Sequence, residues 1–458
     1  MPETNSSDIH ILMFAWFAFG HMTPFLHLAN KLAKRGHRIT FVLPKKAVNQ
    51  LEHLNHYPDL ISFHPVTVPS VTGLPPGTET CSDIPIFLTH FLSIAMDLTR
   101  DQVESVMTSI KPKLVFYDTA HWIPDIAKPL GIKTICFKVV CAASLAIVLV
   151  PARNLTSERP ITEAELAEPP PGYPSTSVVL RGREVQSLLF VSNPFGEGIT
   201  FHERITLALK NCDAISLRTC REVEGKFCDY LGSQYEKPVL LTGPVLPEES
   251  ESPLDERWGN WLAGFEPGSV VYCSFGSQII LGKTQFQELM LGFELTGLPF
   301  FVALKPPLEA ATIEEALPEG FEERVKGRGV VWGGWVQQPL MLAHPSVGCF
   351  VSHCGFGSMW ESLMSDCQIV LVPQLGDQIL NARLMTAELK LAVEVKREEN
   401  GWLSKENLSE AIKSVMDKDS EVGKSVKENH KKWRDTLNPE LMNGYIDKFV
   451  QGMHELVE

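Results

Sequence analysis

The sequence lacks the long hydrophobic segment that would be needed to cross a membrane. Its N-terminal apolar run, residues 9–20, is too short, because a helix that spans a bilayer takes about 20 apolar residues. The residues before this run are polar and acidic, whereas a secretory signal peptide begins with basic residues. We therefore interpret the run as a buried strand.

Basic residues are also scarce, with 41 Lys and Arg against 55 Asp and Glu and a net charge of −14. Nucleic acids and anionic membranes both need a basic surface, so we expect neither as a partner. The ten cysteines show no CxxC or CxxC…HxxxH spacing, which argues against a zinc site and a secreted disulfide framework. We expect free thiols in a cytoplasmic protein.

Short apolar runs alternate with helical patterns in both halves of the chain, which predicts an α/β fold with two doubly wound parallel sheets. The expected strands are IHILMFAW, RITFVL, ISFHPVTV, KLVFY and KTICFKVV in the first half, and SVVYCSF, PFFVAL, GVVWGGW, GCFVS and QIVLVP in the second. A polar segment rich in Pro, Ser and Glu, residues 240–256, is the expected seam between two domains. From Ser404 onward we expect helices and no strand.

A candidate base, His21, lies in the motif GHMTPFLHLANKL behind the first strand. Thr23 is the expected N-cap of a helix with Pro24 in its first turn. His21 would then stand between a strand end and a helix N-terminus, where ligands bind in open α/β sheets. The helix dipole disfavours an imidazolium there, so the ring would stay neutral and able to accept a proton. The alternative is a loop histidine satisfied by the backbone.

A partner for this base is expected in KLVFYDTAHW, where Asp118 follows another strand of the same sheet. A carboxylate can fix the tautomer of a histidine and stabilise its imidazolium. The alternative is a solvated aspartate at a strand end.

The second half contains features typical of a nucleotide site. Trp335 offers a flat face to a base, and Gln338 follows with Pro339 opening a short helix. In HPSVGCFVSHCGFGSMWES, His353 ends a strand and Gly355 and Gly357 permit close approach. Ser358 is expected to begin a helix that favours a diphosphate, with Glu361 one turn later within reach of a ribose. SFGS, with Gly276 and Ser277, is a weaker strand-to-helix turn of the same kind.

Two other classes of enzyme fit this segment less well. GFGSMW lacks the third glycine of G-x-G-x-x-G, and the next strand ends in VPQLGDQ without a lone acidic residue for an adenosine ribose, so a dinucleotide-dependent oxidoreductase is disfavoured. GFGSM is also not a G-x-S-x-G nucleophile elbow, so a serine hydrolase is not indicated. A nucleotide-sugar enzyme remains the favoured interpretation.

Residues 335–378 closely resemble the signature box of the plant family 1 UDP-dependent glycosyltransferases, and Gly20, His21, Asp118 and SFGS match other landmarks of that family. The resemblance implies a GT-B fold, in which two Rossmann-like domains face a cleft. The implied domains are an acceptor-binding domain at 1–245, a UDP-sugar-binding domain at 246–435, and a C-terminal helix at 436–458 that packs back on the N-terminal domain.

The resemblance also implies roles for individual residues. His21 and Asp118 would be catalytic, Trp335 would stack on uracil, Val336 would offer its backbone, and Gln338 and Glu361 would reach the ribose. The diphosphate would contact His353, Ser358 and Ser277, and the transferred sugar would contact Asp377 and Gln378. The remaining donor-binding positions are Gly20, Gly355, Phe356 and Gly357. Candidate acceptor contacts are Phe17, Phe19, His121, Trp122 and the stretch 186–195.

The sequence departs from the family pattern at three places. Phe356-Gly357 replaces the usual Trp-Asn, Val336-Gln337 replaces Ala-Pro, and SDCQ replaces the common AGVP. Together these features resemble the branch that adds a sugar to the sugar of a flavonoid or anthocyanin glycoside.

The expected reaction is a metal-independent, inverting displacement in which UDP-sugar is the co-substrate and no cofactor takes part. UDP-glucose is the first choice of donor, followed by UDP-rhamnose and UDP-xylose, and we expect a monomer. Two alternatives are the glycosylation of an aglycone such as a flavonol, terpenoid or hormone, and a non-catalytic protein that binds nucleotide sugars.

Overall fold

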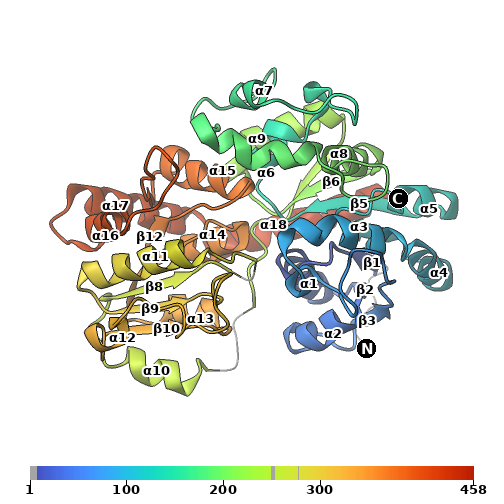
Figure 1. The fold of residues 1–458 in the computed structure, drawn as a ribbon. Helices are drawn as coiled ribbons and strands as arrows, with labels where there is room; N and C mark the ends of the chain where they lie inside the picture. Colours follow the sequence, from blue (N-terminus) through green and yellow to red (C-terminus); the bar gives the residue numbers. More distant parts are fainter. Residues whose placement is uncertain (1–7, 249–252, 277) are drawn as a thin grey trace. The chain divides into compact units, whose positions relative to one another are not determined.

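The computed structural model describes residues 8–248, 253–276 and 278–458. The chain forms two compact units (Figure 1). The first unit contains the described residues up to Glu248 together with Pro439–Glu458, and the second ends at Asn438. Among the described residues, none of the helices has the length and the apolar composition that crossing a membrane would require.

The first unit is built on a seven-stranded parallel sheet with the order β3-β2-β1-β4-β5-β6-β7. Its strands are β1 His10–Phe14, β2 Arg38–Pro44, β3 Ile61–Val66, β4 Leu114–Tyr117, β5 Lys133–Lys138, β6 Ala214–Leu217 and β7 Val239–Leu241. Its α-helices are α1 Phe19–Ala33, α2 Lys45–Leu51, α3 Thr89–Asp97, α4 Arg100–Ile110, α5 Ile123–Ala127, α6 Ala142–Val148, α7 Glu163–Ala167, α8 Phe201–Asn211, α9 Arg221–Tyr235 and α18 Pro439–Val457. The strand order reverses between β1 and β4, so the carboxyl ends of these strands mark the position where such sheets bind ligands.

The second unit has a six-stranded parallel sheet with the order β10-β9-β8-β11-β12-β13. Its strands are β8 Val270–Ser274, β9 Phe300–Ala303, β10 Gly329–Trp332, β11 Val347–Ser352, β12 Gln368–Leu371 and β13 Val393–Glu394. Its α-helices are α10 Glu256–Leu262, α11 Lys283–Thr296, α12 Phe321–Arg324, α13 Gln338–Ala343, α14 Phe356–Leu363, α15 Asp377–Arg383, α16 Lys405–Met416 and α17 Glu421–Thr436. Here the order reverses between β8 and β11, and His353 follows β11 directly.

All ten strands expected from the sequence are present, and the helices expected after Ser404 are confirmed. Ser404 caps α16, because its hydroxyl accepts a hydrogen bond from the amide of Asn407. The sequence interpretation missed β6, β7 and β13, which have four residues or fewer. β7 was missed because its last two residues, Leu240 and Leu241, belong to the segment that was interpreted as a seam between domains.

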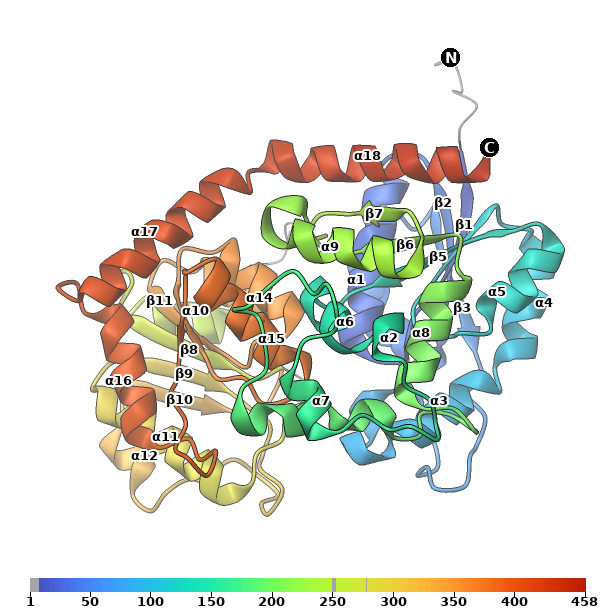
Figure 2. The ribbon, with the colours of Figure 1, turned by 90° about the horizontal axis from the view of Figure 1, so that it is seen from above.

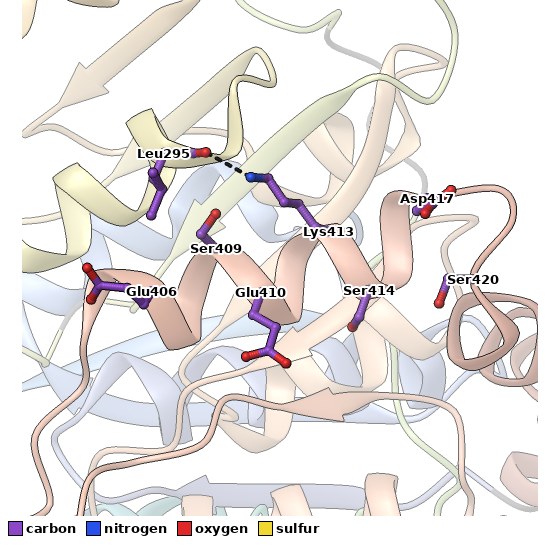
Figure 3. A pocket seen from close by; sticks show the side chains of 8 residues that line it. All are labelled: Leu295, Glu406, Ser409, Glu410, Lys413, Ser414, Asp417 and Ser420. Carbon is purple, nitrogen blue, oxygen red and sulfur yellow. Dashed lines mark hydrogen bonds between the residues drawn. The ribbon is translucent and has the colours of Figure 1, made fainter.

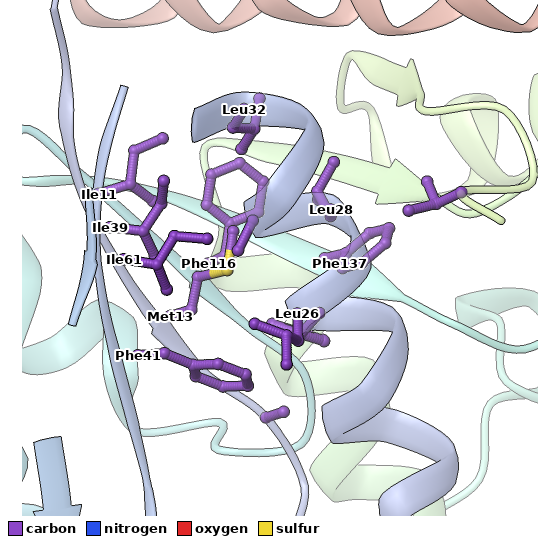
Figure 4. Packing of buried hydrophobic residues seen from close by; sticks show 14 of the residues in the cluster. Ile11, Met13, Leu26, Leu28, Leu32, Ile39, Phe41, Ile61, Phe116 and Phe137 are labelled. Atoms are coloured by element: carbon purple, nitrogen blue, oxygen red, sulfur yellow. The ribbon is translucent and has the colours of Figure 1, made fainter. Parts of the chain in front are cut away.

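Aliphatic and aromatic side chains from β1, β2, β4, β5 and α1 form the core of the first unit (Figure 4). The rings of Phe25 on α1 and Phe137 on β5 lie 5.0 Å apart. The C-terminal helix α18, which is seen along its length in Figure 2, adds Ile446, Phe449 and Met453 to this core. The rings of Phe449 and Phe116 are 5.9 Å apart. Residues from both ends of the chain therefore pack into one apolar core.

Buried histidines in the first unit predict a loss of stability in mild acid. Burial lowers the pKa of His27 to about 3, whereas the unfolded chain binds a proton near pH 6.5. Between pH 6 and pH 4 the imidazole of His27 is therefore protonated in the unfolded state and neutral in the folded state. For this group the free energy of unfolding falls by about 1.4 kcal/mol for each pH unit below 6. Glu224 acts in the opposite direction, because burial raises its pKa to about 7.

The expected result is that His27→Leu makes the pH dependence of stability shallower by about one proton between pH 6 and pH 4. Urea unfolding at several pH values measures this slope. An unchanged slope in the variant would show that His27 does not titrate in this way.

Candidate active site

His21 lies in the first turn of α1, since the helix begins earlier than the sequence suggested. The expected N-cap, Thr23, is wrong: the structure places the N-cap at Ala18, whose carbonyl accepts hydrogen bonds from the amides of His21 and Met22, both at 2.9 Å. Pro24 then stands inside the helix. The helix N-terminus nevertheless remains beside His21, which is the third residue of α1.

The structure brings His21 and Asp118 into contact. His21 Nδ1 is hydrogen-bonded to Asp118 Oδ2. Strands β1 and β4 are adjacent, with Phe14 opposite Tyr117, so the segments that follow them meet at one edge of the sheet. The Asp118 side chain is only 2% exposed, whereas that of His21 is 25% exposed. The carboxylate therefore holds the inner nitrogen of a ring that still reaches the surface of the unit.

A third residue of this cluster, Lys138, was missed in the sequence interpretation. Its ammonium donates to Asp118 Oδ1 at 3.1 Å and to the Asp118 carbonyl at 2.7 Å, and its side chain is 3% exposed. Burial alone would raise the pKa of Asp118, but Lys138 and then His21 lower it to about 2. The available signal in the sequence was Lys138 itself, a charged residue among the apolar residues of KTICFKVV.

Two of the four named acceptor candidates have buried side chains. Phe17 is fully buried with its ring 5.7 Å from that of Phe14, and Trp122 is buried with its Nε1 donating to Asp97 Oδ1 at 2.8 Å. Neither ring has a free face for a ligand, because internal packing uses both. Phe19 and His121 are partly exposed and stay candidates.

Gln338 and Glu361, which were expected at the ribose, lie together with Ser358, which was expected at the diphosphate. Gln338 Nε2 donates to Ser358 Oγ at 3.0 Å and to Glu361 Oε2 at 2.7 Å. Gln338 opens α13, whereas Ser358 and Glu361 lie one turn apart on α14. Trp335, three residues before Gln338, is 79% exposed, so its indole presents a free apolar face. Val336 is buried in the apolar core.

The turn from β11 into α14 is crowded around His353. Burial lowers the pKa of His353 to about 4, so the ring is neutral near pH 7. A Cβ added at Gly355 would lie 2.6 Å from His353 Nε2, and one at Gly276 would lie 3.1 Å from the same atom. Cys354, between His353 and Gly355, adopts a left-handed φ of 69°, which is strained for a residue with a side chain. This strain turns the chain into α14.

Helix α14 begins at Phe356, two residues before the expected start at Ser358, with Gly355 as its N-cap. The Phe356 side chain is buried with its ring 6.0 Å from that of Trp360, so only its backbone is placed to meet a ligand. Gly357 is the next residue of the first turn. The backbone amides of this turn favour an anion. Ser277 lies outside the described residues.

Asp377 and Gln378, the expected sugar contacts, begin α15. Gln378 Oε1 accepts hydrogen bonds from the amides of Gln374 and Leu375 at 3.0 and 3.1 Å. The side chain therefore fixes the backbone of the loop that precedes α15. Asn381, which the sequence interpretation missed, is fully buried and donates to the Cys354 carbonyl at 2.8 Å and to Asp377 Oδ2 at 3.4 Å. This side chain links the turn between β11 and α14 to the first residue of α15.

A surface hollow of roughly 510 Å³ lies along α16 in the second unit (Figure 3). It is bordered by Glu406, Glu410 and Asp417, and Lys413 Nζ donates to the Leu295 carbonyl at 3.0 Å. None of the expected site residues lines it, so it is separate from the nucleotide-type cluster. In the part of the chain that the structure describes, no group of three or more His, Cys, Asp or Glu side chains is arranged to hold a metal ion.

Comparison with solved structures identifies the fold. A UDP-glucosyltransferase from Polygonum tinctorium superposes with a TM-score of 0.81 at 20% identity, covering 99% of each chain. UGT2 of Phytolacca americana superposes with a TM-score of 0.78 at 22% identity, covering 98% of this chain and 100% of that one. The expected GT-B fold, with two Rossmann-like units, is confirmed.

Sequence comparison identifies the family. Residues 323–432 match the family model described as UDP-glucoronosyl and UDP-glucosyl transferase. Anthocyanidin 3-O-glucoside 2'''-O-xylosyltransferase of Arabidopsis thaliana is 61% identical over 100% of this chain and 99% of its own length. UDP-glycosyltransferase 79B6 of the same plant is also 61% identical, over 99% of this chain and 98% of its own. The chain therefore belongs to the UDP-glycosyltransferase family, and the resemblance found in the sequence is confirmed.

Proposed function

We propose that this UDP-glycosyltransferase moves a sugar from UDP to a sugar hydroxyl of a flavonoid or anthocyanin glycoside. The observation that supports it most directly is the contact between His21 Nδ1 and the buried Asp118, which is the arrangement that a general base requires. The name of the relative that is 61% identical, an anthocyanidin 3-O-glucoside xylosyltransferase, supports the acceptor class. A protein that only binds nucleotide sugars would need neither residue.

The chemical step that we propose is a single in-line displacement. Asp118 accepts a hydrogen bond from His21 Nδ1, which leaves Nε2 as the proton acceptor. His21 Nε2 removes the proton of the acceptor hydroxyl, and the oxygen attacks the anomeric carbon as UDP leaves. Asp118 stabilises the imidazolium that forms, and the anomeric configuration inverts.

The donor contacts are proposed from the second unit. Trp335 stacks on uracil, Gln338 and Glu361 hold the ribose, and Asp377 and Gln378 hold the transferred sugar. Neutral His353 and the amides at the start of α14 face the diphosphate, whose charge grows as it leaves. Ser358 and the backbone of Gly355, Phe356 and Gly357 belong to the same contact. We assign acceptor binding to the first unit, near Phe19 and His121.

The test is turnover with a panel of donors and acceptors. UDP-glucose, UDP-rhamnose and UDP-xylose compete in one mixture, with flavonoid glycosides and their matching aglycones as acceptors, and mass spectrometry identifies the product. The expected result is UDP release with a product one sugar heavier than a glycoside. A product from aglycones alone would support the second candidate acceptor class, and no turnover with any pair would contradict the proposal. We expect a cytoplasmic monomer that uses UDP-sugar as co-substrate without a cofactor.

A further inference from the structure

A buried lysine shares the carboxylate of the proposed catalytic pair. Building on the roles proposed above for His21 and Asp118, we propose that Lys138 is a positioning residue that keeps this pair unprotonated, and so ready to accept the substrate proton, at lower pH. Lys138 would act through Asp118 and need not touch the substrate.

The three side chains come from three adjacent strands. His21 follows β1, Asp118 follows β4 and Lys138 is the last residue of β5, and the sheet order is β1-β4-β5. The two carboxylate oxygens of Asp118 have different partners. Oδ2 is hydrogen-bonded to His21 Nδ1, and Oδ1 accepts a hydrogen bond from Lys138 Nζ at 3.1 Å. The same ammonium donates to the Asp118 carbonyl at 2.7 Å. Lys138 therefore fixes both the carboxylate and the backbone of the turn after β4.

The charges of the cluster give the lysine an electrostatic role. Lys138 and ionised Asp118 together are neutral, so a proton added to the His21–Asp118 pair creates a net positive charge beside two buried side chains, which are 2% and 3% exposed. Without the ammonium the same proton would neutralise a buried negative charge, which is favourable. The proton would bind more readily in that case, whichever of the two side chains carried it.

The titratable side chains that interact with Lys138 or Cys136, besides the pair, are Tyr117, Cys136 and Cys212. On the other side of the turn, buried Arg204 donates to the Thr119 carbonyl at 3.2 Å and is ion-paired with Asp97, so its charge is compensated. Burial raises the pKa of Cys136 to about 12 and also raises the pKa values of Tyr117 and Cys212, so all three are uncharged near pH 7. Burial opposes a charged lysine, but Cys136 and Asp118 raise the pKa of Lys138 overall. Lys138 is therefore the positive charge that faces the pair from inside the sheet.

The experiment measures the pH profile of kcat/KM for wild type and for Lys138→Met, Lys138→Gln and Lys138→Arg. Methionine removes the charge with a side chain of similar length, and glutamine keeps a hydrogen-bond donor. The acidic limb of the profile is expected to move to higher pH by about one unit or more in both neutral variants. Arginine keeps the charge and is expected to keep the wild-type limb.

Lys133→Met is the matched control, because Lys133 begins the same strand and its half-exposed ammonium lies 3.8 Å from Asp213 Oδ1. Its acidic limb is expected to stay in place. Thermal unfolding shows that each variant is folded. An acidic limb that does not move in Lys138→Met and Lys138→Gln would overturn the proposal. Wild-type turnover is measured first, so that an absence of UDP release counts against the proposed function and an unmoved limb counts against Lys138 alone.

Discussion

His21→Ala is expected to lower kcat by about 10²–10⁴, because positioned general-base catalysis contributes that much to rate. UDP binding is expected to persist, since the residues assigned to the donor, apart from Gly20, belong to the second unit, whereas His21 belongs to the first. Steady-state kinetics with the best donor and acceptor, together with calorimetric titration of UDP, measure the two effects separately.

The matched control for this prediction is His10→Gln. His10 begins β1, at the opposite end of the strand from His21, and its Nε2 is 3.0 Å from Thr40 Oγ1. Glutamine can preserve that hydrogen bond, so turnover should match wild type. Turnover of His21→Ala close to the wild-type rate would mean that another group removes the proton.

Gly355→Ala is expected to weaken UDP binding by about 10- to 100-fold, the effect of losing one hydrogen bond to a charged group at the turn between β11 and α14. The new Cβ would lie 2.6 Å from His353 Nε2, a distance that van der Waals contact does not allow. The imidazole cannot move away freely, because the side chain is buried and Gly276 lies beside its Cε1 and Nε2 atoms. Either His353 or the first turn of α14 must move, and both are proposed to contact the diphosphate.

Gly259→Ala is the control for a glycine replaced in the same unit. Gly259 lies inside α10 with open space around the position of an added Cβ. Alanine there is expected to stabilise the protein by about 0.5–1 kcal/mol and to leave UDP affinity unchanged. Calorimetric titration and thermal unfolding of both variants provide the comparison. Equal UDP affinity in Gly355→Ala and wild type would remove the phosphate role from this turn.

The sequence predicted the contact between His21 and Asp118 because both residues follow recognisable strands of the first sheet. Lys138 escaped prediction, because its role depends on β5 lying next to β4, and neighbour relations between strands are not visible in a local pattern. The burial of Phe17 and Trp122 could not be predicted for a related reason. Aromatic residues near a strand end can line a pocket or fill the core, and here Asp97 on a separate helix binds the Trp122 indole.

The start of α1 shows the limit of local capping rules. Thr23 followed by Pro24 is a good helix start by residue type, yet the backbone begins the helix at Phe19. By contrast, the strand–turn–helix segment that carries Gln338, Ser358 and Glu361 could be predicted from the sequence, because its elements are short and regularly spaced. Asn381 was missed there because its hydrogen bond reaches back to Cys354, 27 positions earlier.

The return of α18 to the first unit bears on how the chain folds during synthesis. Ile446, Phe449 and Met453 complete a core whose first strand is β1, so this core cannot close until residues 446–453 have been synthesised. The second unit is continuous in sequence and ends at Asn438, so all of its residues leave the ribosome before that happens. The first unit therefore completes its core only after the second unit has been synthesised. Nascent chains stalled before Pro439 would leave the apolar residues that pack against α18 exposed to chaperones.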